Sequence, residues 1–110
     1  KHIFIVCGKT DMRRGIDGLA AIVTDTYQLD VFSQALFLFC GGKIDRFKAL
    51  YWDQDGFLLL YKRLESGKLQ WPRKREDVQQ LSQQELRWLL EGLSLQQPKA
   101  LKPAKPGYLN

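Results

Sequence analysis

The sequence is poor in the residues from which most catalytic and metal sites are built. It has one histidine, His2, and two cysteines, Cys7 and Cys40, which lie far apart and form no CxxC pair. A structural zinc site needs about four His or Cys ligands at close spacing. A Ser/His/Asp or Cys/His site needs a histidine base beside its nucleophile, and His2 lies near the terminus. The sequence therefore predicts no catalytic residues, no metal site and no cofactor.

Long apolar runs are absent as well. No segment approaches the roughly 20 residues that cross a bilayer, and no signal-peptide pattern is present. These absences predict a cytoplasmic protein without a membrane partner. In a reducing cytoplasm we expect Cys7 and Cys40 to be small buried hydrophobic residues, with a disulfide as the alternative.

Acidic residues are outnumbered in the second half of the chain. Residues 1–59 have seven Lys or Arg and seven Asp or Glu, whereas residues 60–110 have ten and five. The whole net charge of +5 therefore belongs to the C-terminal half, which is attractive to polyanions such as DNA. The length and the composition predict one α+β domain over residues 1–96. Residues 97–110 are predicted to be a basic tail rich in Pro and Lys.

The N-terminal segments read as a strand followed by a helix. Ile3–Val6 is a short β-branched run. The stretch TDMRRGIDGLAAIV places apolar residues at helical spacing on one face, with Thr10 or Asp11 as the cap. Arg13 and Asp17 are four residues apart and are expected to pair on the opposite face. The apolar face is formed by Met12, Ile16, Leu19, Ala20, Val23 and Tyr27.

The middle of the chain alternates strands with turns. Four segments, residues 35–40, 46–52, 57–65 and 68–71, are separated by GG, DQDG and SG turns. Such short connections predict an antiparallel β-meander of about four strands. Ser82 and Glu85 then form a capping box that opens a helix ending near Gly92. The predicted fold is this meander plus the N-terminal strand, with two packed helices.

The second hairpin allows two registers. If Trp52 pairs with Phe57, one face presents aromatic side chains interleaved with basic ones, as on sheets where nucleotides stack. If Asp53 pairs with Phe57, the aromatic side chains form a core layer instead. The second register is preferred, and the first remains open.

Two glycines inside the first helix need a reason, because each costs a helix about 1 kcal/mol relative to Ala. A neighbouring strand packed against Gly15 and Gly18 is the preferred explanation, and contact with a partner is the alternative. The predicted partner or close-approach surface consists of Arg13, Arg14, Gly15, Asp17 and Gly18.

The basic residues of the hairpins and of the WPRKRED segment are the candidate DNA contacts. A Trp beside three consecutive bases suits a phosphate backbone. The aspartates, in contrast, sit where turns and helix caps prefer them, so a metal-dependent nuclease ranks third among the functions. The predicted DNA-binding residues are Arg46, Lys48, Lys62, Arg63, Lys68, Trp71, Arg73, Lys74 and Arg75.

Three stretches together resemble a known family. TDMRRGIDGLAAIV, LFLFCGGKIDRFKALYWDQDGFLLLYKRLESGKLQWP and LSQQELRWLLEGL are similar, in order and spacing, to the TnpB accessory protein of the insertion-sequence-66 family of bacterial transposable elements. The similarity covers about residues 5–93. The chain departs from the pattern at Cys40 and Gly41, where many relatives carry Arg and then another residue.

The resemblance implies a role in transposition beside a separate transposase that carries out strand transfer. It supplies no catalytic residues, which agrees with a non-enzymatic function. The leading hypothesis is an accessory protein of transposition that binds DNA, with the transposase proteins of the same element as partners. The alternative is a protein-interaction module that assembles with the transposase without contacting DNA.

Overall fold

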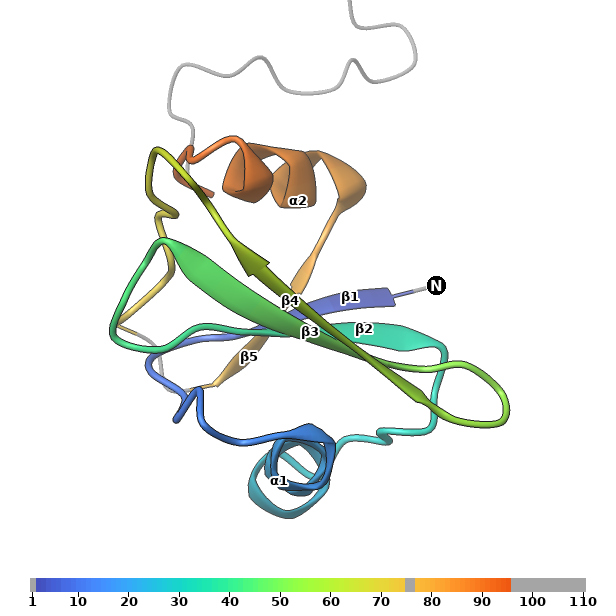
Figure 1. Ribbon diagram of the computed structural model, residues 1–110. Helices are drawn as coiled ribbons and strands as arrows, with labels where there is room; N and C mark the ends of the chain where they lie inside the picture. Colours follow the sequence, from blue (N-terminus) through green and yellow to red (C-terminus); the bar gives the residue numbers. More distant parts are fainter. Residues whose placement is uncertain (1, 75–76, 96–110) are drawn as a thin grey trace, which may run out of the picture.

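The computed structural model describes residues 2–74 and 77–95. A five-stranded mixed sheet has the order β4-β3-β2-β1-β5, and its two faces carry one helical segment each (Figure 1). The strands are β1 (His2–Val6), β2 (Ala35–Phe39), β3 (Arg46–Trp52), β4 (Phe57–Arg63) and β5 (Val78–Leu81). The helices are α1 (Ile16–Ala21), which continues as the π-helix η1 (Ile22–Thr26), and α2 (Gln83–Leu90). The α+β class is confirmed.

The antiparallel meander has three strands rather than four. β2, β3 and β4 pair antiparallel in sequence order. The expected fourth strand, residues 68–71, is not part of the sheet, although Leu69 and Trp71 are buried in the core. The Leu69 N–H donates to the Ile44 carbonyl at 2.6 Å, so this segment is bonded to the β2–β3 loop rather than to a strand of the sheet.

The N-terminal strand takes the centre of the sheet. β1 pairs parallel with β2, and α1 with η1 forms the crossover between them. The other neighbour of β1 is β5, which pairs with it antiparallel. β5 was not expected, because its sequence VQQL has neither strict alternation nor β-branched richness.

The first helix begins later than the spacing predicts. Residues 11–14 form a turn in which the Arg14 N–H donates to the Asp11 carbonyl, and the helix is capped at Gly15. Thr10 and Asp11 are therefore not its caps. The second helix follows the prediction: Ser82 and Glu85 form the capping box, and Gly92 has a left-handed backbone.

The second hairpin adopts the register that was not preferred. Trp52 lies opposite Phe57, and the four residues 53–56 form the turn. Its left-handed residue is Gln54, with φ of 60°, and not Gly56. Because side chains alternate between the faces, Phe47 is buried on the α2 side while Leu50 is buried on the α1 side.

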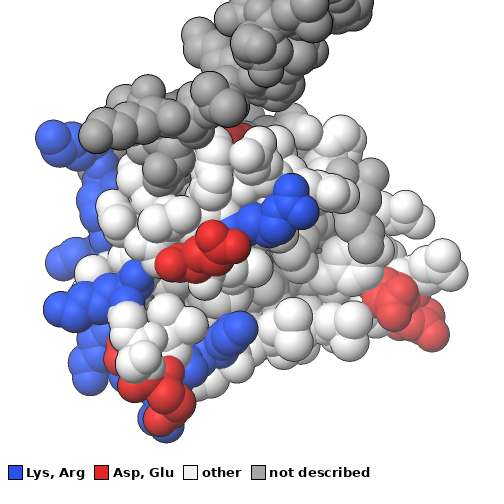
Figure 2. All heavy atoms as spheres, turned by 90° about the horizontal axis from the view of Figure 1, so that it is seen from above, with Lys and Arg blue, Asp and Glu red and all other residues white. Residues whose placement is uncertain are grey.

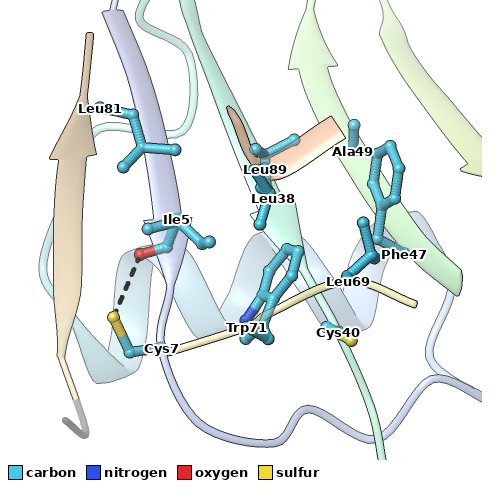
Figure 3. Close-up of a cluster of buried hydrophobic side chains, with 10 residues drawn as sticks. All are labelled: Ile5, Cys7, Leu38, Cys40, Phe47, Ala49, Leu69, Trp71, Leu81 and Leu89. Carbon is cyan, nitrogen blue, oxygen red and sulfur yellow. Dashed lines mark hydrogen bonds between the residues drawn. The ribbon is translucent and has the colours of Figure 1, made fainter. Parts of the chain in front are cut away.

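The core has two layers, one on each face of the sheet. The layer under α2 includes both cysteines, which are buried and unoxidised as expected. Trp71 lies among these side chains (Figure 3). The layer under α1 is built from Phe37, Phe39, Leu50, Leu19 and Val23.

Candidate functional site

The sheet topology collects nearly all basic residues at one end of the molecule. Because β1 and β2 are parallel and their other neighbours antiparallel, the C-terminal ends of β1, β2 and β4 meet the N-terminal ends of β3 and β5. We call this the basic end. Of the Lys and Arg residues that the structure describes, only Arg87 of α2 lies elsewhere. The basic end contains Lys9, Arg13, Arg14, Lys43, Arg46, Lys48, Lys62, Arg63, Lys68, Arg73 and Lys74.

The basic residues are concentrated on one side. Figure 2 shows most Lys and Arg along one side of the α2 face, with some acidic side chains among them, and only acidic charge at the opposite side. The opposite end of the sheet has the acidic turn of Asp53 and Asp55, together with Asp30. No described Lys or Arg lies at that acidic end.

Lys48 holds the loop that leads into α1. Its Nζ donates to the carbonyls of Met12 and Arg14, at 2.8 Å each, and lies 5.8 Å from the centre of the Tyr61 ring. Three ammonium donors therefore meet two carbonyls and one aromatic face. Lys48, predicted to contact DNA, is directed inward to a structural role.

Arg73 joins the ends of the two parallel strands. Its guanidinium donates to the Gly8 carbonyl at 2.9 Å and to the Gly41 carbonyl, and it contacts the Cys40 sulfur at 3.8 Å. Burial raises the pKa of the Cys40 thiol, and the nearby Arg73 opposes this rise only in part. Arg73 is thus committed to backbone carbonyls.

Trp71 is not a surface residue. It is 5% exposed, and its Nε1 donates to the Val6 carbonyl at 2.9 Å. Trp71, predicted as a DNA contact beside the basic triplet, is instead part of the α2-side core. The indole N–H explains why a Trp suits this position, since a buried indole needs an acceptor.

Three arginines at the basic end have carboxylate partners. Arg46 pairs with Asp45 at 2.8 Å, and this pairing lowers the pKa of Asp45. Arg63 pairs with Glu65 at 3.2 Å. The third pair is Arg13 with Asp11 at 2.9 Å, so the expected pair of Arg13 with Asp17 is not formed.

The Asp11 pair is the most perturbed of the three. Arg13 donates to the Asp11 carboxylate from both its side chain and its backbone. These hydrogen bonds lower the pKa of Asp11 to about 2. Both side chains are open to solvent, at 91% and 42% exposure, so the pair shapes the loop more than it stabilises the fold.

Six of the bases are exposed, and the structure records no hydrogen bond or ion pair for their side chains within the described residues. Three of them, Lys62, Lys68 and Lys74, were predicted as DNA contacts, and Arg14 was assigned to the partner surface. Lys9 and Lys43 were missed, although both follow strands whose parallel pairing brings their ends together. Arg75 lies outside the described residues. The six unpaired cations are Lys9, Arg14, Lys43, Lys62, Lys68 and Lys74.

An open groove of about 720 Å³ lies at the basic end, between residues 10–13, residues 41–43 and the β3–β4 hairpin. The two loops beside this groove can approach closely because residue 41 is a glycine: a Cβ there would lie 2.6 Å from the Met12 Cγ. A Cβ added at Gly15 would meet nothing within 4 Å, and one added at Gly18 would meet the side chain of Arg14 at 3.1 Å. The expected strand against Gly15 and Gly18 is therefore absent, and Gly41 is the glycine that permits a close approach.

The aromatic and basic face of the hairpin is only partly open. At its far end Phe32 contacts the Trp52 and Phe57 rings, at 5.0 and 5.7 Å between centroids. Leu50, in the middle, is fully buried. Of the hairpin's own rings only Tyr61 is exposed, at 55%, while Phe32 at the far end is 58% exposed. The two exposed rings lie at opposite ends of the face, so they form no continuous row on which bases could stack.

The aspartates do not assemble into a metal site. Among residues 2–74 and 77–95, no group of three or more His, Cys, Asp or Glu could hold a metal ion. Asp53 begins the β3–β4 turn, where its N–H donates to the Gly56 carbonyl at 2.7 Å. No helix in these ranges is long and apolar enough to span a membrane.

Comparison with known proteins gives one family. The family model described as "IS66 Orf2 like protein" matches residues 1–100. The chain belongs to this family. It is similar to two uncharacterized proteins of Sinorhizobium fredii (strain NBRC 101917 / NGR234), named y4jC and y4hO. It is 34% identical to the first over 94% of this chain and 88% of the relative, and 32% identical to the second over 96% and 93%.

The IS66 Orf2-like family places the chain among the accessory proteins of insertion-sequence transposition, in agreement with the resemblance found in the sequence. No solved structure matches the chain.

Proposed function

We propose that this accessory protein binds duplex DNA through the basic end. The observation that carries the proposal is the gathering of cations from five separate strand ends, six of them exposed and without a recorded side-chain partner among residues 2–74 and 77–95. Unpaired Lys and Arg side chains can replace the counterions condensed on phosphates, whereas cations committed to carbonyls cannot without loss of structure.

Phosphate contacts fit this surface better than base stacking does. Most of the hairpin's aromatic rings are covered, so the surface is charged but has a single exposed ring, Tyr61. Lysines on separate loops can follow a backbone, and they specify no sequence by themselves. The proposed binding is therefore electrostatic, with any preference for element ends supplied by other contacts or by the transposase.

Neutralising the unpaired cations tests the proposal. In Lys9→Gln/Lys43→Gln/Lys68→Gln, the slope of log K against log[salt] for duplex DNA should become shallower by about 0.9 for each phosphate that the protein no longer binds. Arg87→Gln, on α2 and outside the basic end, is the matched control and should keep the slope. Salt-independent binding, or an unchanged slope in the triple variant, would contradict the proposal.

A second candidate function is assembly with the transposase proteins of the same element. The exposed stretch Arg13–Gly15, with open space around Gly15, favours it. A gel-shift series with element-end DNA, random DNA and added transposase separates the two. DNA retarded by the accessory protein alone supports the first function, and DNA retarded only with transposase supports the second.

A further inference from the structure

One edge of the sheet is long and unprotected. β4 has seven residues, all in continuous register with β3, and no strand of the described residues lies on its outer side. Natural edge strands are usually short, bulged, or interrupted by Pro or charge. The other edge strand, β5, has four residues. The middle of β4, from Leu58 to Tyr61, has no such protection.

The hydrogen bonds that flank the hairpin ladder fix which backbone groups face outward. The Asp53 N–H donates to the Gly56 carbonyl, and the Leu64 N–H donates to the Asp45 carbonyl. Bonded pairs alternate in an antiparallel ladder, so the even-numbered residues of β4 are bonded to β3. The groups that face outward belong to Phe57, Leu59, Tyr61 and Arg63.

The same strand carries exposed apolar side chains on the α2 face. Leu58 is 54% and Leu60 64% exposed. Beside them lie Leu36, Ala49 and Tyr51, which line a shallow cavity of about 180 Å³. An unpaired edge next to an apolar patch favours a partner that supplies both a strand and apolar side chains.

We propose that β4 pairs antiparallel with β4 of a second copy of this chain, about a two-fold axis through Leu59. This register bonds the outward groups of Leu59 to those of its own copy. It places Leu58 opposite Leu60 twice, which covers the exposed leucines. Just beyond the strands it brings Arg63 beside Asp55 of the second copy.

Charge decides the orientation. Two parallel β4 strands would bring two basic ends together, whereas antiparallel strands place each basic end beside the acidic turn of the other copy. A two-fold contact is also self-complementary, so one sequence serves both sides. Shifting the axis to Leu60 or Tyr61 loses the two Leu58–Leu60 pairs. The axis at Leu59 alone combines apolar cover with opposite charge.

Sedimentation of the full chain over a range of concentrations tests the dimer. The wild type should show a concentration-dependent dimer, and Leu60→Lys should raise its Kd about tenfold or more by burying a charge beside the axis. Leu90→Lys, at an exposed leucine of α2 (40%), is the control and should leave the Kd unchanged. Circular dichroism shows whether both variants fold. A wild type that is monomeric throughout, or a dimer insensitive to Leu60→Lys, overturns the proposal.

Charge reversal and hydrogen exchange test the register. Arg63→Asp and Asp55→Arg should each weaken the dimer several-fold, and the double exchange should restore it. On raising the protein concentration, the amides of Leu59 and Tyr61 should gain protection, whereas that of Leu60, already bonded to β3, should change little. Dimerisation without new protection at Leu59 and Tyr61 would mean face-to-face packing and would overturn strand pairing.

Discussion

Replacing Lys48 by Met separates a structural cation from a DNA-binding one. The change keeps an apolar stem of similar length but removes the two 2.8 Å hydrogen bonds to the Met12 and Arg14 carbonyls. A hydrogen bond to a charged group contributes about 1.5–3 kcal/mol. Because Lys48 is only half-buried, each bond contributes about 1.5–2 kcal/mol, at the lower part of this range, and both bonds together give about 3–4 kcal/mol.

This loss is large beside the usual total. A domain of this size has a stability of about 5–15 kcal/mol, and at about 110 residues each 1 kcal/mol lowers Tm by roughly 4–5 °C. Lys48→Met should therefore melt roughly 10–20 °C below the wild type in a calorimetric or circular-dichroism scan. The loop at residues 11–14 should loosen first, which hydrogen exchange of its amides would report.

Lys62→Met is the matched control. Lys62 is on the adjacent strand, exposed, and without a recorded side-chain partner in the described part of the chain. Its stability should change by no more than about 0.5 kcal/mol, while the salt slope of DNA binding should become shallower. If Lys48→Met were as stable as Lys62→Met, the hydrogen bonds of Lys48 to the loop would not stabilise the fold, and Lys48 would again be a candidate DNA contact.

Two further predictions concern the loop before α1. Arg13→Ala should move the pKa of Asp11 from about 2 toward its ordinary value of 3.8, measured by NMR titration of the carboxyl carbon. Since the pKa of Asp11 is lower in the folded state, the contribution of the pair to stability is present above about pH 4 and is lost as the pH falls toward 2. A Tm difference between wild type and Arg13→Ala that appeared only near pH 2 would contradict this. Gly41→Ala should cost about 1–3 kcal/mol by crowding Met12. Gly15→Ala, in open space, should cost less than about 1 kcal/mol in a denaturant titration. Equal losses at both glycines would contradict the packing, and a stable Gly15→Ala protein that fails only in transposition would make that stretch an interaction surface.

Local signals predicted the parts of the fold that depend on neighbours in sequence. Ser82 and Glu85 need only each other to form a capping box, and the two hairpins need only short turns. The preferred register of the second hairpin was wrong because the DQDG turn accommodates either pairing, and core packing selects between them. Phe57 and Leu59 of β4 pack with Leu50 in the α1-side core, and only the register that places Trp52 opposite Phe57 puts them on that face.

The sheet order could not be obtained in this way. β1 is joined to β2 by a crossover of 28 residues, from Cys7 to Gln34, and to β5 across most of the chain. Residues 68–71 satisfy strand preferences as well as VQQL does. They are excluded from the sheet because Leu69 and Trp71 fill the α2-side core.

The candidate site shows the same limit. Basic residues can be counted in a sequence, but the acceptors that engage them are backbone carbonyls far along the chain. Lys48 reaches carbonyls 36 and 34 positions away, and Arg73 reaches 65 and 32. None of these four carbonyls has a sequence signature, so cations bonded to carbonyls and unpaired cations look alike until the fold is known.

The committed cations also position the unpaired ones. Arg73 ties the Gly8 carbonyl to the Gly41 carbonyl, and the loops that it joins carry Lys9 and Lys43. An unpaired cation on a loop that is already held in place binds phosphate more tightly than one on a mobile loop, because less loop entropy is lost on binding. Neutralising Arg73 would therefore weaken DNA binding without any contact to DNA. DNA affinity and the free energy of unfolding must be measured together on each variant. Replacing a cation that contacts DNA lowers the affinity alone, whereas replacing a cation that holds a loop, such as Arg73, lowers both.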